Sequence, residues 1–345
     1  MKQDGYAPRA QLCDVSFLSG QYRLGSVSLV RDLGGAYNLN PLLQTERGKY
    51  VLRLYRPWVT QLRLSQQHQV KRLLAHAGFP VPLPLPAISG ETILRNHDHL
   101  LELEPFIAHD GEADTWERNG IAFSLLGNLH AFLGTEATNI HLIDPVVSNY
   151  GTPEMLLAWT RQAAEESSQS PQQIKAQQTR QALSLYTEAM QMLITLQEQW
   201  DKTQEQLPRQ LTHGDYGGGN LLFLHEQPVA MLDFDFMRIR KRVFELAYTL
   251  YWWLGKQGHI AAVSCWHRVK ELLAFYNEAT FMPLTVQEIR ALPLEMARVP
   301  LYWIAETHLF PNPANEVIKH VEKITDAHWI LEHASQLADL FVQAV

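Results

Sequence analysis

The chain has 345 residues, of which 46% are hydrophobic, and a formal net charge of −7. This length suits one large domain or two ordinary ones, and the apolar content is that of a folded, water-soluble protein. The acidic balance argues against general nucleic-acid binding, and the longest apolar stretch, near residue 250, is too short to span a bilayer, so we expect a cytoplasmic protein without nucleic-acid or membrane partners.

The first part of the chain predicts a small β-rich lobe. Residues 27–57 alternate β-branched and aromatic residues between Gly, Asn and "ERGK" breakers, which indicates three antiparallel strands. Residues 59–78 carry apolar residues at helical spacing and end at Gly78, and residues 91–106 predict two more strands. We place a lobe boundary after Pro105, which gives lobes of residues 1–105 and 106–345.

The second part predicts a larger helical lobe. Residues 112–206 are mainly helical in pattern, with a Gln-rich stretch at 167–181 that is typical of a solvated loop and helix face. Three further helical segments follow residue 240, and we assign their Trp and Tyr stripes to the core. The predicted fold class is therefore α+β. The two cysteines, Cys13 and Cys265, lie far apart with no metal-ligand spacing, so neither a disulfide framework nor a zinc site is indicated.

Residues 210–236, "QLTHGDYGGGNLLFLHEQPVAMLDFDF", place polar side chains around a predicted hairpin. With "HEQP" as the turn, its centre falls between Glu226 and Gln227, and Asn220 and Asp233 are equidistant from it. Residues that face each other across an antiparallel pair have Cβ atoms about 5 Å apart. Two oxygen-bearing side chains at that separation can hold one Mg²⁺ ion.

Acidic side chains on both sides of this hairpin suggest one cleft. Strand alternation places Asp233 and Asp235 on the same face. Asp215 precedes the hairpin in a loop whose glycines at 217–219 permit a tight turn, and such a loop is a common position for a general base. The alternative to a catalytic site is that Asp215 is a turn residue, Asn220 caps a strand, and Asp233 and Asp235 form a solvated strand end. For each residue taken alone, this is the simpler interpretation.

These residues carry a resemblance to a known family. "HGDYGGGN" matches the H-x-D-x-x-x-x-N catalytic loop of kinases, in the H-G-D form of the aminoglycoside phosphotransferase and choline kinase-like families. "LDFDF" resembles their metal-binding Asp segment, and "LLGNLHAFLG" resembles a helix that often precedes the catalytic loop. The resemblance implies a bilobal protein kinase-like fold, with one helix in the small antiparallel β lobe.

The resemblance also implies roles for individual residues. Asp215 is expected to be the catalytic base, Asn220 and Asp233 are expected to be Mg²⁺ ligands, and His213 is expected to brace the loop. Asp235 matches an acidic position of relatives, and Glu245 stands at a position where a structural contact is expected. Further residues are expected to contact the nucleotide: Gly34, Gly35 and Asn38 in "LGGAYNLN", Arg53, and Glu102 at the linker to Phe106.

Two departures from the family pattern concern the nucleotide site. Arg53 stands where a phosphate-contacting lysine is usual, and alternation places it on the same face as Val51 and Tyr55; the alternative is an exposed strand residue. The following helix has no acidic residue to pair with this cation, and Gln67 occupies the expected position. The cation is then held by hydrogen bonds or by another acid.

The leading hypothesis is an ATP- and Mg²⁺-dependent phosphotransferase that acts on a hydroxyl group of a small molecule. A pseudokinase with a binding or regulatory role, or a Ser/Thr protein kinase of the same fold, are the alternatives. The basic run Arg238, Arg240, Lys241 and Arg242 is either a contact for an anionic acceptor or a solvated loop. The sequence indicates neither the acceptor nor the oligomeric state.

Overall fold

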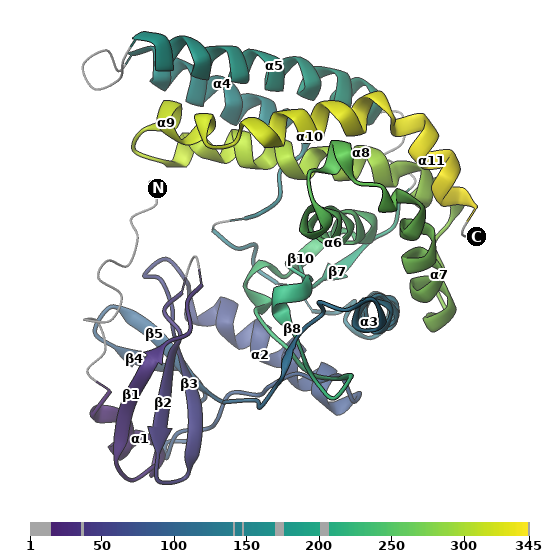
Figure 1. The fold of residues 1–345 in the computed structure, drawn as a ribbon. Coiled ribbons are helices and arrows are strands. Elements are labelled where there is room, and N and C mark those ends of the chain that lie inside the picture. The colour runs from purple at the N-terminus through teal and green to yellow at the C-terminus, as the bar shows by residue number, and fades with distance from the viewer. Residues whose placement is uncertain are drawn as a thin grey trace.

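The computed structural model describes residues 15–35, 38–140, 142–146, 148–169, 176–200 and 207–343. A small lobe with a five-stranded antiparallel sheet is followed by a larger, mainly helical lobe (Figure 1). The expected α+β class with two lobes is thereby confirmed. Cys13 and part of the Gln-rich stretch lie outside the described residues.

The small-lobe sheet has the strand order β1-β2-β3-β5-β4, so β3 and β5 are central neighbours. Their register pairs Arg53 with Glu102 and Val51 with Glu104, which places charged residues on adjacent strands. The strands follow the short helix α1 (Phe17–Tyr22) and are β1 (Val27–Asp32), β2 (Pro41–Thr45), β3 (Gly48–Leu54), β4 (Leu94–Asn96) and β5 (His99–Pro105).

Helix α2 (Gln61–His76) lies between the small-lobe sheet and the larger lobe (Figure 1). Thr60 caps its first turn by accepting a hydrogen bond from the backbone N–H of Arg63, and the chain leaves the helix through Gly78 at φ 89°. Val70 and Leu74 on this helix pack into the core of the large lobe. The helix therefore belongs to both lobes in packing terms.

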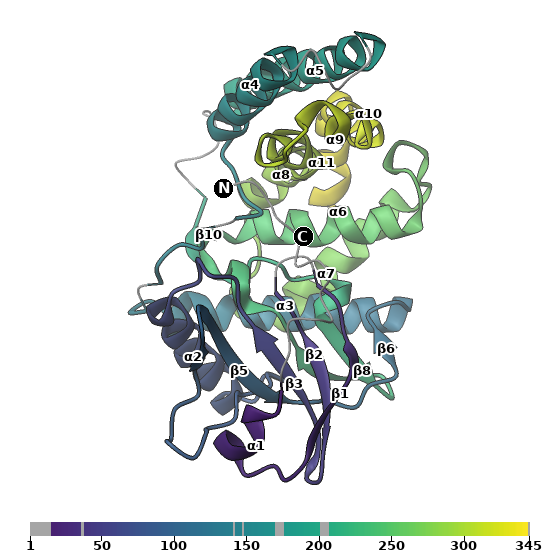
Figure 2. The ribbon, with the colours of Figure 1, turned by 90° about the vertical axis from the view of Figure 1, so that its left-hand side faces the viewer.

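The large lobe stacks its helices in layers above the small lobe (Figures 1 and 2). The pair α4–α5 lies farthest from the small-lobe sheet, and α3 and α6 lie nearer to it. No helix among the described residues is long and apolar enough to cross a membrane. The helices are α3 (Trp116–Glu136), α4 (Pro153–Gln169), α5 (Ala176–Trp200), α6 (Arg242–Gln257), α7 (Val269–Ala279), α8 (Val286–Ala305), α9 (Pro313–Ile318), α10 (Val321–Glu332) and α11 (Ala334–Val342).

Five short strands, β6 to β10, form two small sheets in the larger lobe. Strand β6 pairs with β8, which pairs with β9, and β10 pairs with β7. The strands are β6 (Gly111–Glu112), β7 (Arg209–Thr212), β8 (Leu221–Leu224), β9 (Gln227–Met231) and β10 (Arg238–Lys241).

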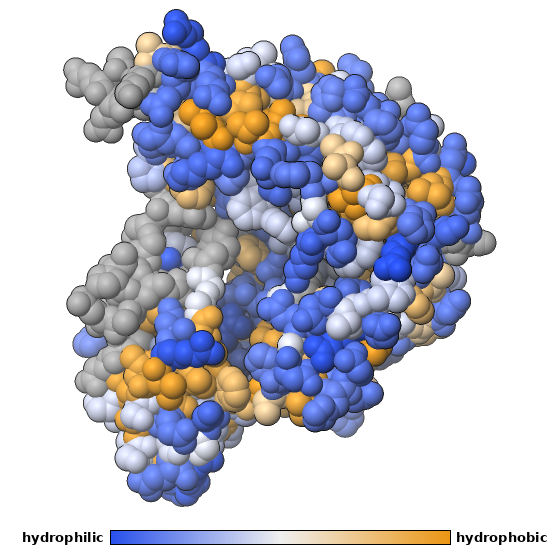
Figure 3. Space-filling view, in the orientation of Figure 1, coloured by the Kyte–Doolittle hydropathy of each residue, from blue (hydrophilic) through white to orange (hydrophobic). Residues whose placement is uncertain are grey.

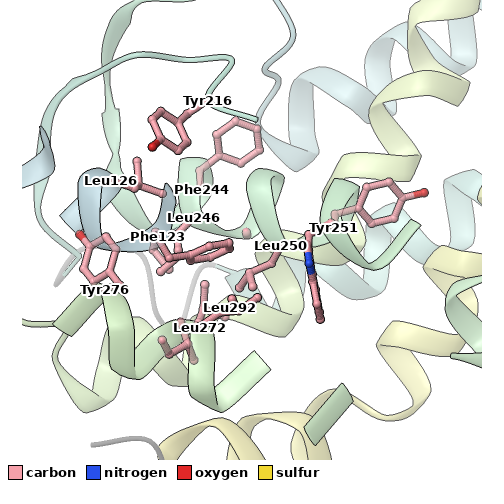
Figure 4. Close-up of a cluster of buried hydrophobic side chains, with 14 of the residues drawn as sticks. Phe123, Leu126, Tyr216, Phe244, Leu246, Leu250, Tyr251, Leu272, Tyr276 and Leu292 are labelled. Atoms are coloured by element: carbon pink, nitrogen blue, oxygen red, sulfur yellow. The ribbon is translucent and has the colours of Figure 1, made fainter. Parts of the chain in front are cut away.

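The largest hydrophobic core lies where α3, α6, α7 and α8 meet (Figure 4). Tyr216, the residue after Asp215, is part of this core, and its hydroxyl donates a hydrogen bond to the carbonyl oxygen of Ala122 at 2.7 Å. The loop that carries Asp215 is therefore anchored directly in this core.

Three residues of the basic run make structural contacts, so the alternative of a solvated loop is wrong for them. Arg240, Lys241 and Arg242 are buried. The guanidinium of Arg240 lies over the rings of Tyr150 and Phe244, and Arg242 donates two hydrogen bonds to Glu288 at 2.6 and 2.9 Å. These residues hold β10 and α6 against the helical core.

Candidate active site

Asp215 lies in the loop between β7 and β8 and accepts hydrogen bonds on both carboxylate oxygens. The hydroxyl of Tyr248 donates to Oδ1 at 2.6 Å, and Nδ2 of Asn220 donates to Oδ2 at 3.0 Å. Burial and the nearby charge of Asp233 raise the pKa of Asp215 to about 7. A carboxylate that is fixed in place and basic near neutral pH is suited to accept a proton.

His213 braces this loop in its neutral form. Its Nε2 lies 2.8 Å from the carbonyl oxygen of Leu232, and the backbone N–H of Asp215 donates to its Nδ1 at 3.3 Å. Nδ1 must therefore be the unprotonated nitrogen. Burial lowers the pKa of His213, which agrees with this assignment.

Glu245 on α6 holds the other side of the loop, as expected for a structural contact. It accepts hydrogen bonds from the backbone N–H groups of His213, at 3.1 Å, and of Gly214. It also lies 2.8 Å from Nε2 of His130, which belongs to the α3 segment "LLGNLHAFLG". One buried carboxylate thus joins two of the motifs that carried the family resemblance.

The glycine at which a side chain would clash in this loop is Gly214. It has φ 92°, and a Cβ atom there would lie 2.1 Å from the carbonyl oxygen of Phe236. In the triplet at 217–219, Gly217 has an extended backbone at φ −166° with open space around it. The tight turn expected there is a 3₁₀ turn at Gly218–Asn220.

The hairpin exists, but its predicted register is wrong by one residue. His225 and Glu226 form a two-residue turn with positive φ at both positions, and an irregularity follows in the pairing of β8 with β9. Asn220 consequently faces Leu232, whose N–H donates to its carbonyl oxygen at 2.7 Å. Asp233 follows in the left-handed region at φ 60° and starts a 3₁₀ turn at 234–236, so strand alternation does not apply there.

Both acids of this segment nevertheless point to the same cation. Nη2 of Arg53 lies 3.2 Å from Asp233 Oδ1 and 3.0 Å from Asp235 Oδ2. Although burial opposes ionisation, the Arg53 guanidinium holds the pKa of Asp233 below its ordinary value. Burial and the neighbouring Asp233 raise the pKa of Asp235 to about 7, against the effect of Arg53. The alternative of an exposed strand residue at Arg53 is wrong, because Arg53 is buried.

A cavity of about 410 Å³ between the lobes, which we call the Arg53 cavity, gathers several predicted residues. Gly34, Gly35 and Arg53 line it together with Asn220 and Asp233. The surface is hollowed between the lobes in the space-filling view (Figure 3). Its other lining residues include apolar side chains and the linker, namely Leu33, Val51, Leu222, Leu232 and Glu104–Ile107.

Two predicted nucleotide contacts lie elsewhere. Glu102 is 1% exposed and does not line the Arg53 cavity; it pairs with His68 and lies 3.6 Å from Lys71 Nζ. The linker residues that line the cavity begin at Glu104, two positions further along. Asn38 donates a hydrogen bond to Asp235 and lines a neighbouring cavity.

The neighbouring cavity, which we call the Asp215 cavity, has a volume of about 200 Å³. Asp215, Asp233, Asp235 and Glu306 supply acidic groups to its wall, and no Lys or Arg of the described residues lines it. Tyr248, Tyr302 and Trp303 supply aromatic rings. The sequence analysis did not predict Tyr248, Tyr302, Trp303 or Glu306 as site residues, because they lie outside the motifs. Tyr248 belonged to an aromatic stripe that was assigned to the core.

Asn220 and Asp233 fit a divalent cation by their chemistry. The Asn220 amide donates through Nδ2 to Asp215, so Oδ1 is its free acceptor atom, and both residues line the Arg53 cavity. Mg²⁺ prefers one or two protein oxygen ligands together with substrate phosphates. The described residues contain no cluster of three or more His, Cys, Asp or Glu side chains that would form an all-protein metal site.

Comparison with known proteins decides the family. The model of the phosphotransferase enzyme family matches residues 28–268, which is more than half of the chain. The chain belongs to this family. It is therefore a phosphotransferase of the small-molecule kinase type, as the resemblance implied.

Individual relatives are more distant. The homoserine kinase of Methylocella silvestris is 26% identical over 282 residues, covering 81% of this chain and 80% of the relative. The structure of an amicoumacin kinase in complex with AMP-PNP, Ca²⁺ and its ligand "Ami" has a TM-score of 0.62 at 16% identity, covering 96% of both chains. A microcompartment-associated aminopropanol kinase has a TM-score of 0.60 at 15% identity, covering 94% of this chain and 97% of the other. These structural likenesses establish the fold.

Proposed function

We propose that this phosphotransferase uses Mg²⁺ and ATP to phosphorylate a hydroxyl group of a small acceptor that also carries a positively charged amino group. The observation that carries the proposal is the pair of adjoining cavities that share Asp233, with Asp215 in the wall of one and Arg53 in the wall of the other. The Arg53 cavity suits the nucleotide, and the Asp215 cavity suits the acceptor.

The Arg53 cavity offers both parts of a nucleotide site. Val51, Leu222 and Leu232 provide apolar contacts for a purine base, and Arg53 provides a cation for phosphate. Nε of Arg53 is buried without a hydrogen-bond partner among the described residues, which leaves a donor for an anionic ligand. A metal ion held by Asn220 and Asp233 would neutralise charge on the nucleotide phosphates.

Asp215 is the proposed general base. The acceptor hydroxyl donates its proton to the Asp215 carboxylate while the hydroxyl oxygen forms a bond to the γ-phosphorus of ATP. The bond from that phosphorus to the β–γ bridging oxygen breaks, and ADP leaves with the electron pair. Tyr248 and Asn220 hold the carboxylate in place for this transfer.

The Asp215 cavity suggests the class of acceptor. Its acidic groups attract a cation, and ammonium groups also bind favourably over aromatic rings such as that of Trp303. Pockets for drug-sized ligands are about 300–1,000 Å³, so a cavity of about 200 Å³ favours a small amino alcohol over a multi-ring aminoglycoside. The name of the aminopropanol kinase agrees with this size and charge, and that of the homoserine kinase agrees with the size and the ammonium group, although homoserine also carries a carboxylate.

The first test is nucleotide binding. A thermal-shift measurement with Mg-ATP at about a hundredfold excess over its dissociation constant should stabilise the fold by about 2.7 kcal/mol. The shift should disappear with a chelator and in Asp233→Ala, and persist in the control Asp98→Ala, which alters an exposed carboxylate. Absence of any shift with ATP or GTP would favour the pseudokinase alternative.

The second test is turnover. ADP release should be measured with homoserine, 1-amino-2-propanol, ethanolamine, choline and an aminoglycoside. We expect a small amino alcohol to give the highest kcat/KM, and Asp215→Asn to reduce kcat by at least about a hundredfold. Labelled phosphate from ATP appearing in protein instead of the small-molecule fraction of a cell extract would favour the protein kinase alternative.

A further inference from the structure

The metal segment, which we define as Leu232–Met237, is held through its backbone carbonyl groups. His213 binds the carbonyl oxygen of Leu232 at 2.8 Å, and Arg240 donates to that of Phe236 at 2.6 Å. Gln67 Nε2 donates to the carbonyl oxygen of Phe234 at 3.1 Å. Arg63 Nη2 donates to those of Asp235, at 3.1 Å, and Met237.

Two of these four side chains come from one helix of the other lobe. Gln67 and Arg63 both lie on α2, one turn apart, and are 4% and 5% exposed. Arg63 also donates to the carbonyl oxygen of Ile143 at 2.8 Å. All of these hydrogen bonds go to backbone carbonyl groups. Those to Phe234, Asp235 and Met237 connect the helix α2 to the metal segment.

The contacts flank a residue in a disfavoured backbone conformation. Asp233 has φ 60° and ψ 71°, which a non-glycine residue adopts only when its surroundings hold it there. The Leu232 carbonyl is fixed on one side, and the Phe234 and Asp235 carbonyls are fixed on the other. Loosening the α2 side would let the Asp233 carboxylate leave its present orientation.

We infer that Gln67 and Arg63 are positioning residues that set the metal affinity of Asp233, so that the position of α2 controls metal binding. This inference rests on the proposed function. Helix α2 has no acidic residues. Its connection to the metal segment is therefore made by hydrogen bonds from a neutral amide and an arginine. Neither residue is a metal ligand, and neither contacts the reacting atoms.

The test measures metal-dependent ADP binding. The variant Gln67→Met keeps the length of the side chain but removes the donor to Phe234. The control is Gln69→Met, the same change at an exposed position of α2. The readout is the Mg²⁺ or Ca²⁺ concentration that produces half of the ADP-dependent thermal shift.

We expect Gln67→Met to raise the half-maximal Mg²⁺ concentration about tenfold, as is typical when a group that orients a metal ligand is removed. Ca²⁺ tolerates irregular ligand geometry better than Mg²⁺, so its half-maximal concentration should rise less than threefold by the same reasoning. Gln69→Met should match the wild type for both ions. A role limited to general stability would not change the ratio between the two ions.

Each other outcome contradicts the inference in a distinct way. A wild-type protein without a metal-dependent ADP shift overturns the proposed function together with the inference. A normal wild type with unchanged Mg²⁺ dependence in Gln67→Met, or equal weakening for Mg²⁺ and Ca²⁺, overturns the inference alone. If Gln67→Met fails to fold, Arg63→Lys decides, because a single ammonium cannot reproduce the contacts of two guanidinium nitrogens; it should show the same selective loss for Mg²⁺.

Discussion

Glu245 shows how much one buried side chain contributes to the catalytic loop. Its carboxylate is 1% exposed and serves His130 and two backbone N–H groups of the loop. Glu245→Ala leaves these buried groups without a partner, so we expect the free energy of unfolding to fall by about 3–5 kcal/mol. Urea denaturation measures this change. The exposed control Glu271→Ala should stay within about 0.5 kcal/mol of the wild type.

His213 predicts a pH dependence of stability. Because burial lowers its pKa in the folded state, the unfolded state binds more protons as the pH falls below the ordinary histidine value of about 6.5. The stability that neutral His213 contributes is therefore present above that pH and is lost below it. The free energy of unfolding of the wild type should therefore exceed that of His213→Asn by less at pH 5.5 than at pH 7.5. A difference that does not change between these two pH values would contradict a buried neutral histidine.

At this scale, the motif predicted which residues lie together better than it predicted their detailed contacts. The roles expected for Asp215, Asn220 and Asp233 stay predictions, and the structure brings the three residues to one region. Glu102 was expected at the nucleotide because the resemblance places the linker there, but its buried side chain turns to α2, where it pairs with His68 and lies 3.6 Å from Lys71 Nζ. Glu306 and Trp303 lie outside any motif, and only the packing of α8 against α6 brings them to Asp215.

A capping box holds the N-terminus of helix α8. Thr285 and Glu288 satisfy each other's backbone N–H groups, and Glu288 also binds Arg242 at the start of α6. We expect Thr285→Ala to lower the free energy of unfolding by about 1 kcal/mol. Thermal denaturation measures this change, and Thr187→Ala is the control. The Thr187 hydroxyl is exposed and donates a hydrogen bond to a carbonyl oxygen within α5. Equal changes in the two variants would mean that the cap contributes nothing beyond an ordinary helical threonine.

Elements with strong periodicity were predicted closely, and the errors lie where the chain turns. The strands at 27–54 and helix α2 were located from alternation and from Gly78. The hairpin register was wrong because a turn with positive φ at His225 and Glu226 has no glycine or asparagine to mark it. A solvated loop was one of two alternatives for the basic run, and it is wrong for Arg240 and Arg242 because aromatic rings and Glu288 compensate for their burial.

For the whole molecule, the packing of α2 predicts that the lobes unfold together. Leu74 is fully buried in the core of the large lobe although it precedes the proposed lobe boundary. Leu74→Ala should lower the free energy of unfolding by about 2–5 kcal/mol, as for other buried leucines. Eight of the nine tryptophans follow residue 105, so intrinsic fluorescence reports on the large lobe. An unchanged fluorescence transition in Leu74→Ala would show that the lobes unfold independently.

The shared wall of the two cavities has a kinetic consequence. Gly35, Asn40 and Asp233 line both the Arg53 cavity and the Asp215 cavity, so under the proposed function the nucleotide and the acceptor would lie side by side. We therefore expect both substrates to be bound at once and the phosphoryl group to pass directly between them, without a phosphorylated enzyme. Initial-rate plots against one substrate at fixed levels of the other should intersect, whereas parallel lines would indicate a covalent intermediate.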